Sequence, residues 1–339
     1  MTESNSIEIA LSDFERKKLV EQIYISFPRL NRVYSLVEHC HQHSKIAAEP
    51  ECLLITGRQG AGKTTLRRTY SRRYPRQATR DGISVPVLDA AIPVPATVKH
   101  LVTELLSSLG DPMPNKGTIV TQTRRLKTLI RECRVELIIL DEFQHFIDRD
   151  SNVILVTVSN WLKDLLNETG VPMTLIGMPY SDVVLHANAQ LERRFGMRVS
   201  LDPFGWNTPE RQIEFRMFLN FLDEKLPFSR RSGLADPETA LRIFCATEGV
   251  TGYVMKLVRR AAEMSIDEKR ECLDLEVLAW AYDERLSARS PDRANPFTCG
   301  PDDLRLEPVI RQETVSTGAS RRGVAKARVI TAAEVLSGK

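Results

Sequence analysis

The chain has 339 residues, of which 42% are hydrophobic and 27% are charged, and its formal net charge is +3. A chain of this size can bury a substantial core, and its length predicts roughly two domains. No apolar run approaches the roughly 20 residues that a membrane helix needs. The N-terminal stretch MTESNSIEIALSDFERKK is acidic and polar, unlike a signal peptide. These features speak against a membrane or secreted protein, and we expect a cytoplasmic one without a membrane partner.

The six cysteines are scattered along the chain, without the Cys-x-x-Cys spacing of many zinc and redox sites. Several lie in apolar stretches, which favours reduced core thiols over disulfides or a zinc cage. Two stretches are strongly basic, RRTYSRRYPRQATR at 67–80 and RRGVAKARVITAAEVLSGK at the C-terminal end. Composition alone favours a solvated helix face for the first and a disordered tail for the second.

The first predicted helix follows a capping box of Ser12 and Glu15, and a second helix is expected at 30–44. Short, wholly apolar runs then predict strands buried on both faces, at 52–56, 85–90, 136–140, 172–177 and 197–201. Helical patterns lie between them, at 63–73, 95–109, 119–131, 153–167 and 181–195. This alternation predicts a parallel sheet that helices cover on both faces.

After residues 202–210 the strand patterns stop. Four further helices are expected, at 208–224, 236–247, 252–268 and 274–288. From residue 289 onward the hydrophobic periodicity fades. The sequence therefore predicts an N-terminal helical extension, an α/β domain, a small all-helical domain and a C-terminal tail, at 1–48, 49–205, 206–288 and 289–339.

The segment GRQGAGKTT at 57–65 fits the pattern G-x-x-x-x-G-K-[ST] between a predicted strand and a predicted helix. Backbone N–H groups of such a loop and the positive helix end surround a triphosphate. Lys63 would reach the β and γ oxygens, and Thr64 would place its hydroxyl on Mg²⁺. The predicted ATP-binding residues of this loop are Gly57, Arg58, Gln59, Gly60, Ala61, Gly62, Lys63, Thr64 and Thr65. The alternative is a glycine turn that binds nothing.

The segment LIILDEFQHFIDRD at 137–150 carries two carboxylates directly after a buried strand. Because the carboxyl ends of adjacent parallel strands share one edge of a sheet, Asp141 and Glu142 are expected beside the phosphate loop. Asp141 would contact ATP and orient the Mg²⁺ shell, and Glu142 would polarise the attacking water. Glu142 and the phosphate-binding Lys63 are the predicted catalytic residues of these two segments. Glu142 as a mere charge at a helix entry is the alternative.

A transition-metal site is the other interpretation of these polar residues. His145 lacks a second histidine at i+4, where Arg149 stands, so a zinc-binding His-Glu helix cannot form. His39 and His43 have helical i,i+4 spacing, yet no third and fourth ligands are evident. We therefore expect Gln144 and His145 to begin the helix that follows, near a subunit boundary.

A phosphate loop, a strand ending in Asp-Glu and a small helical domain together resemble AAA+ ATPases. More narrowly, the chain resembles TnsC and TniB, AAA+ transposition regulators, and is most similar to the TnsC of type I-F CRISPR-associated transposons. The resemblance rests on GRQGAGKTT, VELIILDEFQHF, LIGMPYSDVVLHANAQLERRF, DPFGW and the NPF at 295–297, and covers about residues 15–297. It implies an AAA+ P-loop fold with a five-stranded parallel sheet, a helical lid domain and a disordered tail for partners.

For the reaction, the resemblance implies an arginine finger that completes the site of a neighbouring subunit. Arg194 matches its position, and the adjacent Arg193 stays an alternative. A second sensor would fall in TGYVMKLVRR, where Lys256 is the predicted ATP contact and Arg259 the alternative.

The end of the fourth strand departs from the AAA+ pattern. A polar sensor is common there, but this chain has Met178 and Pro179, and Ser181 is the nearest hydroxyl. We therefore expect slow hydrolysis of ATP that is coupled to assembly.

The resemblance also implies a heptameric or helical homo-oligomer on double-stranded DNA. Lys99, Lys116 and Thr118 lie where such relatives contact DNA. Lysines and a hydroxyl suit phosphates, so binding should tolerate any sequence. The N-terminal helices would face a TniQ–Cascade targeting complex, and the tail would recruit the TnsA and TnsB transposase proteins.

Three other functions stay open at this stage. A DNA-replication initiator or loader of the AAA+ class would more often carry a winged-helix domain after the helical one. A P-loop kinase of small molecules would need a substrate pocket and an arginine-rich lid. A signalling ATPase would only scaffold proteins.

Overall fold

The computed structural model describes residues 11–47, 49–80, 82–147, 152–289, 293–300, 303–306 and 330–331. The chain folds into two units. The α/β unit runs from Phe27 to Asp202, and the helical unit joins the N-terminal segment up to Ser26 with the chain from Pro203 onward. The predicted recruitment tail lies for the most part outside the described residues.

The α/β unit is built on one five-stranded parallel sheet, which confirms the predicted fold class. Its strand order is β4-β5-β6-β1-β7. The strands are β1 Leu53–Gly57, β4 Val87–Ala91, β5 Leu137–Asp141, β6 Met173–Gly177 and β7 Met197–Leu201. The strand β6 separates β1 from β5, so the two strands that end in the phosphate loop and in Asp141 are not adjacent. They still end at the same edge, because all five strands are parallel.

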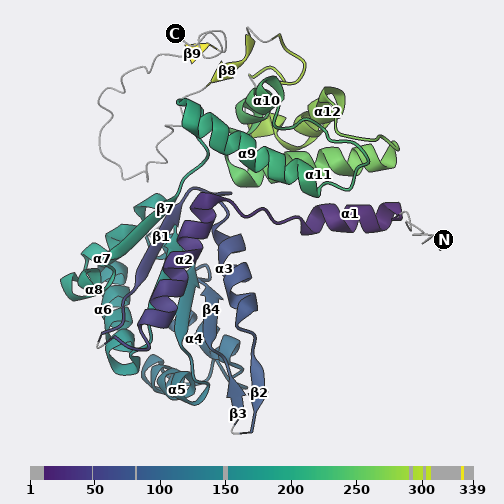
Figure 1. Ribbon diagram of the computed structural model, residues 1–339. Helices are drawn as coiled ribbons and strands as arrows, with labels where there is room; N and C mark the ends of the chain where they lie inside the picture. Colours follow the sequence, from purple (N-terminus) through teal and green to yellow (C-terminus); the bar gives the residue numbers. More distant parts are fainter. Residues whose placement is uncertain are drawn as a thin grey trace, which may run out of the picture. The chain divides into compact units, whose positions relative to one another are not determined.

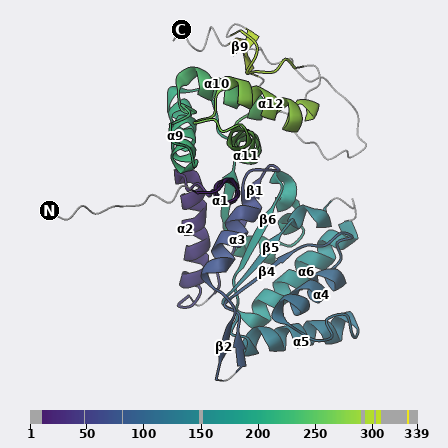
Figure 2. The same ribbon diagram turned by 90° about the vertical axis from the view of Figure 1, so that its right-hand side faces the viewer.

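Helices cover both faces of this sheet, which explains why β5 and β6 are buried along their whole length. Figure 2 shows α2 and α3 on one face and α4 and α6 on the other. The helices of this unit are α2 Pro28–His43, α3 Lys63–Arg73, α4 Val98–Leu109, α5 Ile119–Glu132, α6 Asn152–Thr169, α7 Val183–His186 and α8 Ala189–Arg194. Apolar residues such as Leu66 and Tyr70 on α3, four positions apart, are fully buried against the sheet.

Two elements differ from the sequence prediction. A small antiparallel hairpin, β2 Gln77–Thr79 and β3 Gly82–Ser84, was not expected, because its strands are short and largely exposed and lack apolar alternation. The single helix expected at 181–195 is wrong: the 3₁₀ turn η2 Pro179–Asp182 and the helices α7 and α8 take its place. The break follows from Asn188, whose side chain accepts the N–H groups of Gln190 at 3.0 Å and Leu191 at 3.1 Å and so starts α8.

The helical unit packs around an aromatic cluster. Its helices are α1 Asp13–Gln22, α9 Pro209–Lys225, α10 Pro237–Thr247, α11 Thr251–Asp267 and α12 Leu275–Arg285, and the 3₁₀ turn η3 is Ser287–Arg289 (Figure 1). The ring contacts of its core join Phe204, Trp206, Phe215, Phe218 and Phe244. Two of these residues belong to the DPFGW stretch.

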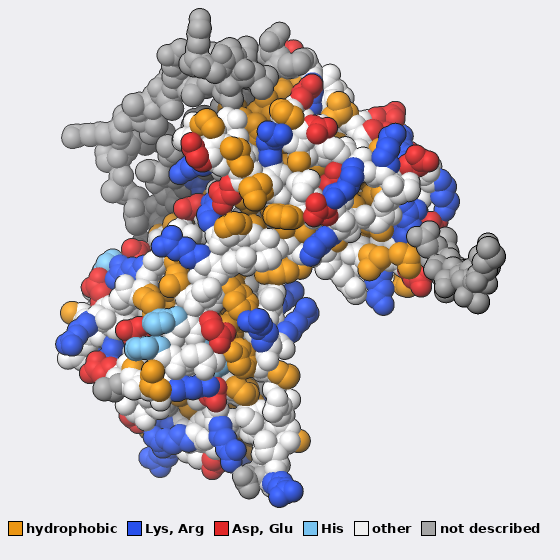
Figure 3. Space-filling view, in the orientation of Figure 1, with side chains coloured by type: hydrophobic (Ala, Val, Ile, Leu, Met, Phe, Trp, Pro, Cys, Tyr) orange, Lys and Arg blue, Asp and Glu red, His pale blue; other side chains and the backbone are white. Residues whose placement is uncertain are grey.

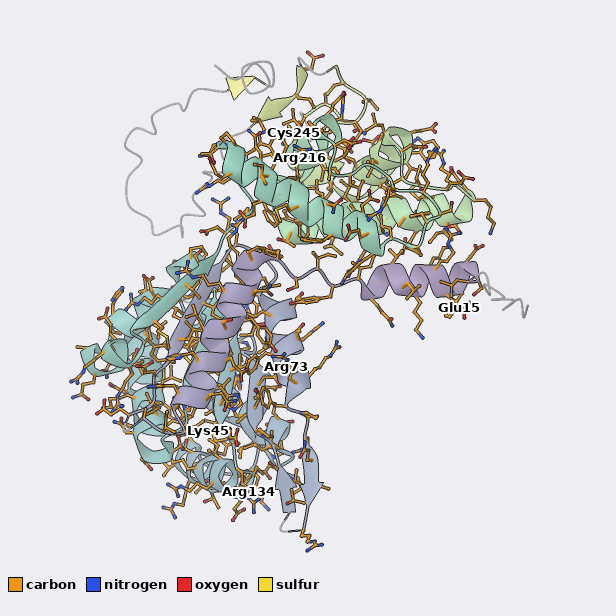
Figure 4. All side chains as sticks on the ribbon, in the orientation of Figure 1. Glu15, Lys45, Arg73, Arg134, Arg216 and Cys245 are labelled. Carbon is orange, nitrogen blue, oxygen red and sulfur yellow. The ribbon has the colours of Figure 1, made fainter. Side chains whose placement is uncertain are left out.

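The N-terminal helix α1 belongs to the helical unit. Ser12 Oγ accepts the N–H of Glu15 at 3.3 Å, and the Ser12 N–H donates to Glu15 Oε2 at 2.9 Å, which confirms the predicted capping box (Figure 4). An ion pair between Lys17 and Asp267, at 2.6 Å, fixes α1 to the end of α11.

The NPF stretch also packs on the helical unit, although it follows the point where hydrophobic periodicity fades. The Arg242 side chain donates to the carbonyl oxygen of Pro296 at 2.7 Å and to that of Cys299 at 2.9 Å, and Phe297 is buried. Two short strands, β8 Arg305–Leu306 and β9 Ile330–Thr331, pair farther along. No helix in the described ranges is long and apolar enough to cross a membrane.

All six cysteines are free thiols, as the sequence predicts. Five are buried, and Cys299 is half-buried. Burial raises the pKa of Cys40 and of Cys52 to about 12, which keeps both thiols protonated.

Candidate nucleotide-binding site

The phosphate loop joins β1 to α3 and depends on its glycines for two different reasons. Gly60 and Gly62 have φ angles of 80° and 95°, in the left-handed region that glycine adopts freely. A Cβ on Gly57 would lie only 2.6 Å from the carbonyl oxygen of Leu201 on β7. The loop is therefore held close against β7, and a Cβ on Gly62 would meet nothing within 4 Å, so open space remains beside the loop.

Lys63 folds back over the loop. Its Nζ donates to the carbonyl oxygens of Gly57 at 2.6 Å and Arg58 at 3.0 Å, and its side chain is largely buried. Neutral carbonyls are weaker partners for an ammonium group than phosphate oxygens are. Of the other predicted ATP contacts in the loop, Gln59 and Thr65 are exposed.

The magnesium side of the site brings Thr64 and Asp141 together. Thr64 Oγ1 donates to Asp141 Oδ2 at 3.1 Å, and Asp141 is 1% exposed. Burial raises the pKa of Asp141, although a hydrogen bond from the Glu142 N–H and the charge of Arg67 oppose this effect. A hydroxyl and a desolvated carboxylate form the oxygen donor set that Mg²⁺ prefers, so these residues fit the ion. Thr64 and Asp141 would hold Mg²⁺, which would supply positive charge that neutralises the phosphate oxygens.

Arg67 is a member of this site that the sequence did not predict. Its Nη1 lies 2.9 Å from Asp89 Oδ2 and its Nε lies 3.3 Å from Asp141 Oδ2. The first basic stretch thus begins with a largely buried guanidinium, and not with a solvated one. Two features of the sequence point to this contact. Arg67 stands four residues after Lys63, on the same face of the helix, and Asp89 is the lone carboxylate of its strand. Arg67 offsets the repulsion between Asp89, in the middle of β4, and Asp141, at the end of β5.

Glu142 and Gln144 form a hydrogen-bonded pair. Glu142 has a φ of 60°, and its N–H donates to Asp141 Oδ1 at 2.9 Å. The 3₁₀ turn η1, Phe143–Phe146, folds the Gln144 side chain back so that its Nε2 donates to Glu142 Oε2. The expectation that Gln144 and His145 begin the following helix is wrong, because both lie in η1 and α6 begins at Asn152. His145 lies in the same turn, separate from α6, and its Nδ1 is 2.8 Å from the carbonyl oxygen of Ile92.

Arg194 ends α8 and lies away from the phosphate loop of its own chain. Its carbonyl oxygen accepts the N–H of Cys52, directly before β1, at 3.0 Å. The loop follows the other end of β1, so about 16 Å of strand separates them at about 3.3 Å per residue. Arg194 Nη1 pairs with Glu49 Oε2 at 3.1 Å, whereas Arg193 is exposed and has no ion pair within the described residues.

The predicted second sensor lies in the helical unit. Lys256 is exposed on α11. Arg259 Nη2 donates to the carbonyl oxygen of Ile23 at 3.3 Å, and Arg259 Nη1 lies 3.7 Å from Glu21 Oε2. The packing of α1 therefore occupies Arg259, and Lys256 is the more accessible cation.

The three predicted DNA contacts are all exposed. Lys99 is exposed in the first turn of α4, and Lys116 is exposed in the link from α4 to α5. Thr118 is exposed too, and its Oγ1 accepts the N–H of Thr121 at 3.4 Å, which caps α5. Figure 3 shows blue Lys and Arg side chains gathered over the α5 end of the α/β unit.

The structure supplies one further ligand for the alternative metal site. Ligand atoms of His39, His43 and Glu51 all lie within 4.8 Å of one another. The His39–Glu51 distance of 3.3 Å equals the edge of a zinc tetrahedron, which is about 3.3 Å for bonds of roughly 2.0 Å. Because two of the three side chains are exposed and the two rings stack, we interpret the group as a surface ion pair with a stacked histidine.

The sheet order, the glycine loop between β1 and α3, and the Asp-Glu pair at the same edge define an AAA+ P-loop protein. The family model described as bacterial TniB protein matches residues 16–204, more than half of the chain. The chain belongs to the TniB family. No curated protein matches the sequence.

Solved structures support the fold. The ORC2 protein of Aeropyrum pernix matches with a TM-score of 0.57 at 18% identity, over 79% of this chain and 71% of that one. CDC6P from Pyrobaculum aerophilum matches with a TM-score of 0.56 at 16% identity, over 80% and 71%. The Drosophila ORC bound to DNA matches with a TM-score of 0.53 at 14% identity, over 88% and 73%. At these identities the likeness shows the fold alone.

Proposed function

We propose that the protein is an ATPase that assembles on double-stranded DNA and links the choice of a transposition target to the transposase. The observation that carries the proposal is the convergence of Lys63, Thr64, Asp141 and Glu142 at one sheet edge. These residues supply a phosphate-binding ammonium, a Mg²⁺ ligand pair and a carboxylate for water, which is the complement that ATP hydrolysis needs.

The position of Arg194 supports the proposed assembly. About 16 Å of β1 separates this arginine from its own phosphate loop, beyond the reach of a side chain. Arg194 can therefore contribute to hydrolysis only at the site of a second subunit. Its ion pair with Glu49 would be exchanged for the γ-phosphate at that interface. A ring or a helical oligomer provides such an interface to every subunit.

DNA binding is proposed from charge and from family membership. Lys99, Lys116 and Thr118 are exposed and suit phosphate contacts, which carry no sequence information. Proteins of the same fold include the Aeropyrum pernix ORC1 protein in complex with DNA and the Drosophila ORC bound to DNA. We propose that the N-terminal helices meet the TniQ–Cascade complex, and that the tail beyond residue 306 recruits TnsA and TnsB.

The test is direct observation of assembly by wild-type protein with ATP, with and without duplex DNA. We expect electron microscopy to show rings or helices around DNA only when nucleotide is present, with slow release of phosphate. Monomers under all conditions would contradict the proposal. Deleting residues 307–339 should spare assembly on DNA and abolish recruitment of TnsB.

A replication initiator or loader is the second candidate, because the ORC and CDC6P structures share this fold. The two functions differ in what the DNA-bound assembly recruits. Capture of a replicative helicase, and not of a transposase, would favour this candidate.

A further inference from the structure

The end of β6 lacks the polar side chain that would connect it to the reaction centre. Met178 and Pro179 follow the strand, and the hydroxyl of Ser181 is fully buried. The Ser181 Oγ has no hydrogen-bond partner among the described residues. A link between the end of β6 and Glu142 must therefore come from a side chain outside β6.

The side chain of Gln144 spans this gap. Its Oε1 accepts the N–H of Met178 at 3.2 Å, and its Nε2 donates to Glu142 Oε2. The orientation of the amide follows from its partners, because a backbone N–H only donates and an ionised carboxylate only accepts. Gln144 is 8% exposed, so little water competes for either hydrogen bond.

Gly177 confirms how closely the Gln144 amide is fitted to the end of β6. A Cβ on Gly177 would lie 2.3 Å from Ser181 Oγ and 3.2 Å from Gln144 Oε1. A side chain at this position would clash with Ser181 Oγ and would also crowd Gln144 Oε1. The absence of a side chain at the last residue of β6 thus leaves the room that Gln144 uses.

We propose that Gln144 is a positioning residue that sets the orientation of the Glu142 carboxylate and ties it to the backbone at the end of β6. The inference rests on the proposed ATPase function. Gln144 acts through Glu142 and need not touch the nucleotide. Many AAA+ proteins have a polar side chain at the end of this strand, and here the Gln144 amide, which comes from η1, takes its place. The amide links the backbone at the end of β6 to the Glu142 carboxylate.

Two substitutions separate this role from a structural one. Gln144→Leu removes both hydrogen bonds at every pH and nearly keeps the volume. Gln144→Glu is close to isosteric, and its charge depends on pH. As a carboxylate it repels Glu142. Once protonated, it again offers one donor to Glu142 and one acceptor to the Met178 N–H. Gln212→Leu is the matched control, because Gln212 Nε2 donates to the Trp206 carbonyl oxygen at 3.0 Å in the helical unit.

The measurements are kcat for ATP hydrolysis and the Kd for a fluorescent ATP analogue, on full-length protein with saturating duplex DNA over a pH series. For Gln144→Leu we expect kcat to fall at least tenfold, within the roughly 10²–10⁴ that a positioned general base contributes. Its Kd for the nucleotide should stay within about twofold of the wild-type value, because Glu142 acts on water and does not bind the nucleotide. The kcat of Gln144→Glu relative to wild type should rise as the pH falls, and that of Gln144→Leu should not.

The possible failures are distinguishable. If wild-type protein hydrolyses no ATP, the proposed function itself is wrong. If wild type is active and the kcat of Gln144→Leu is unchanged, the positioning role is refuted. The same conclusion follows if kcat and nucleotide affinity fall together, or if the relative kcat of Gln144→Glu is independent of pH. Thermal unfolding of each variant, with Gln212→Leu beside it, verifies that the comparison concerns folded protein.

Discussion

Replacing Lys99 and Lys116 with alanine should weaken DNA binding by an amount that can be worked out from their placement. Both side chains are exposed, and neither has an ion pair within the described residues. The link that carries Lys116 turns back beside α4, because Gln122 Nε2 donates to Thr103 Oγ1 at 3.2 Å and to the Pro114 carbonyl oxygen at 2.7 Å. Each lysine is counted as one phosphate contact, and independent contacts make the two losses of affinity multiply.

The expected magnitude follows from counterion release. Each phosphate contact changes the slope of log K against log salt by about 0.9, so losing two contacts should reduce the slope by about 1.8. At physiological salt this corresponds to about a fivefold loss of affinity for each lysine, and about thirtyfold for the pair, per protomer. The nucleotide site is untouched, and its affinity for ATP should not change.

The assay is fluorescence anisotropy of a labelled duplex of arbitrary sequence, with a non-hydrolysable ATP analogue, over a series of salt concentrations. Lys18→Ala with Arg32→Ala removes the same charge from two exposed positions, on α1 and α2, and is the control. An unchanged salt slope in the Lys99 and Lys116 double variant would refute the reasoning. Single variants whose losses fail to multiply would refute the claim of separate contacts.

Three other predictions concern the nucleotide site and the core. Arg194→Ala should lower kcat by roughly 10³-fold or more, as for other arginine fingers, without weakening nucleotide binding, while Arg193→Ala changes little. Mixing Arg194→Ala with Lys63→Ala protein should restore hydrolysis, because an intact site then meets an intact arginine; a mixture that stays inactive argues against action between subunits. Gly57→Ala should lower the free energy of unfolding by about 1–3 kcal/mol, since its Cβ would lie 2.6 Å from the Leu201 carbonyl oxygen. Gly196→Ala, whose Cβ would lie 3.9 Å from the nearest atom, should change it by less than about 0.5 kcal/mol in denaturant titrations, and equal losses would be inconsistent with this packing. Burial lowers the pKa of His41, whose ring lies 2.8 Å from Tyr70 Oη and 2.9 Å from Glu136 Oε2. Its contribution to stability is therefore complete above the ordinary histidine pKa of about 6.5 and is lost as the pH falls towards the lowered value. His41→Gln should flatten this part of the stability curve, and parallel curves for the two proteins would exclude the assignment.

Much of the fold could be predicted because the buried strands leave a strong pattern. The runs CLLIT, ELIIL and PMTLIG contain no charge except at one end, and strands of this kind occur only where helices cover both faces of a sheet. The hairpin at 77–84 left no such pattern, because its residues face solvent. The break of the helix before Asn188 depends on a side-chain cap, which helical periodicity does not reveal.

The site divides in the same way. Lys63, Thr64 and Asp141 could be predicted, because a continuous motif or the end of a buried strand positions them. Arg67 and Gln144 escaped, because their roles arise from contacts between elements far apart in sequence, Arg67 with Asp89 and Gln144 with the Met178 N–H. The Gln144 side chain folds back from a 3₁₀ turn, and such a contact produces no periodic pattern in the sequence.

The central claim is that ATP holds the protein in an assembly on DNA and that hydrolysis through Glu142 releases it. Glu142→Gln keeps a similar shape and removes the carboxylate that would polarise water. The decisive measurement is the lifetime of the variant on duplex DNA with ATP, by electron microscopy and phosphate release side by side with wild type. We expect persistent rings or helices and a loss of hydrolysis. An unaltered ATPase rate, or assemblies that dissociate as fast as those of wild type, would contradict it.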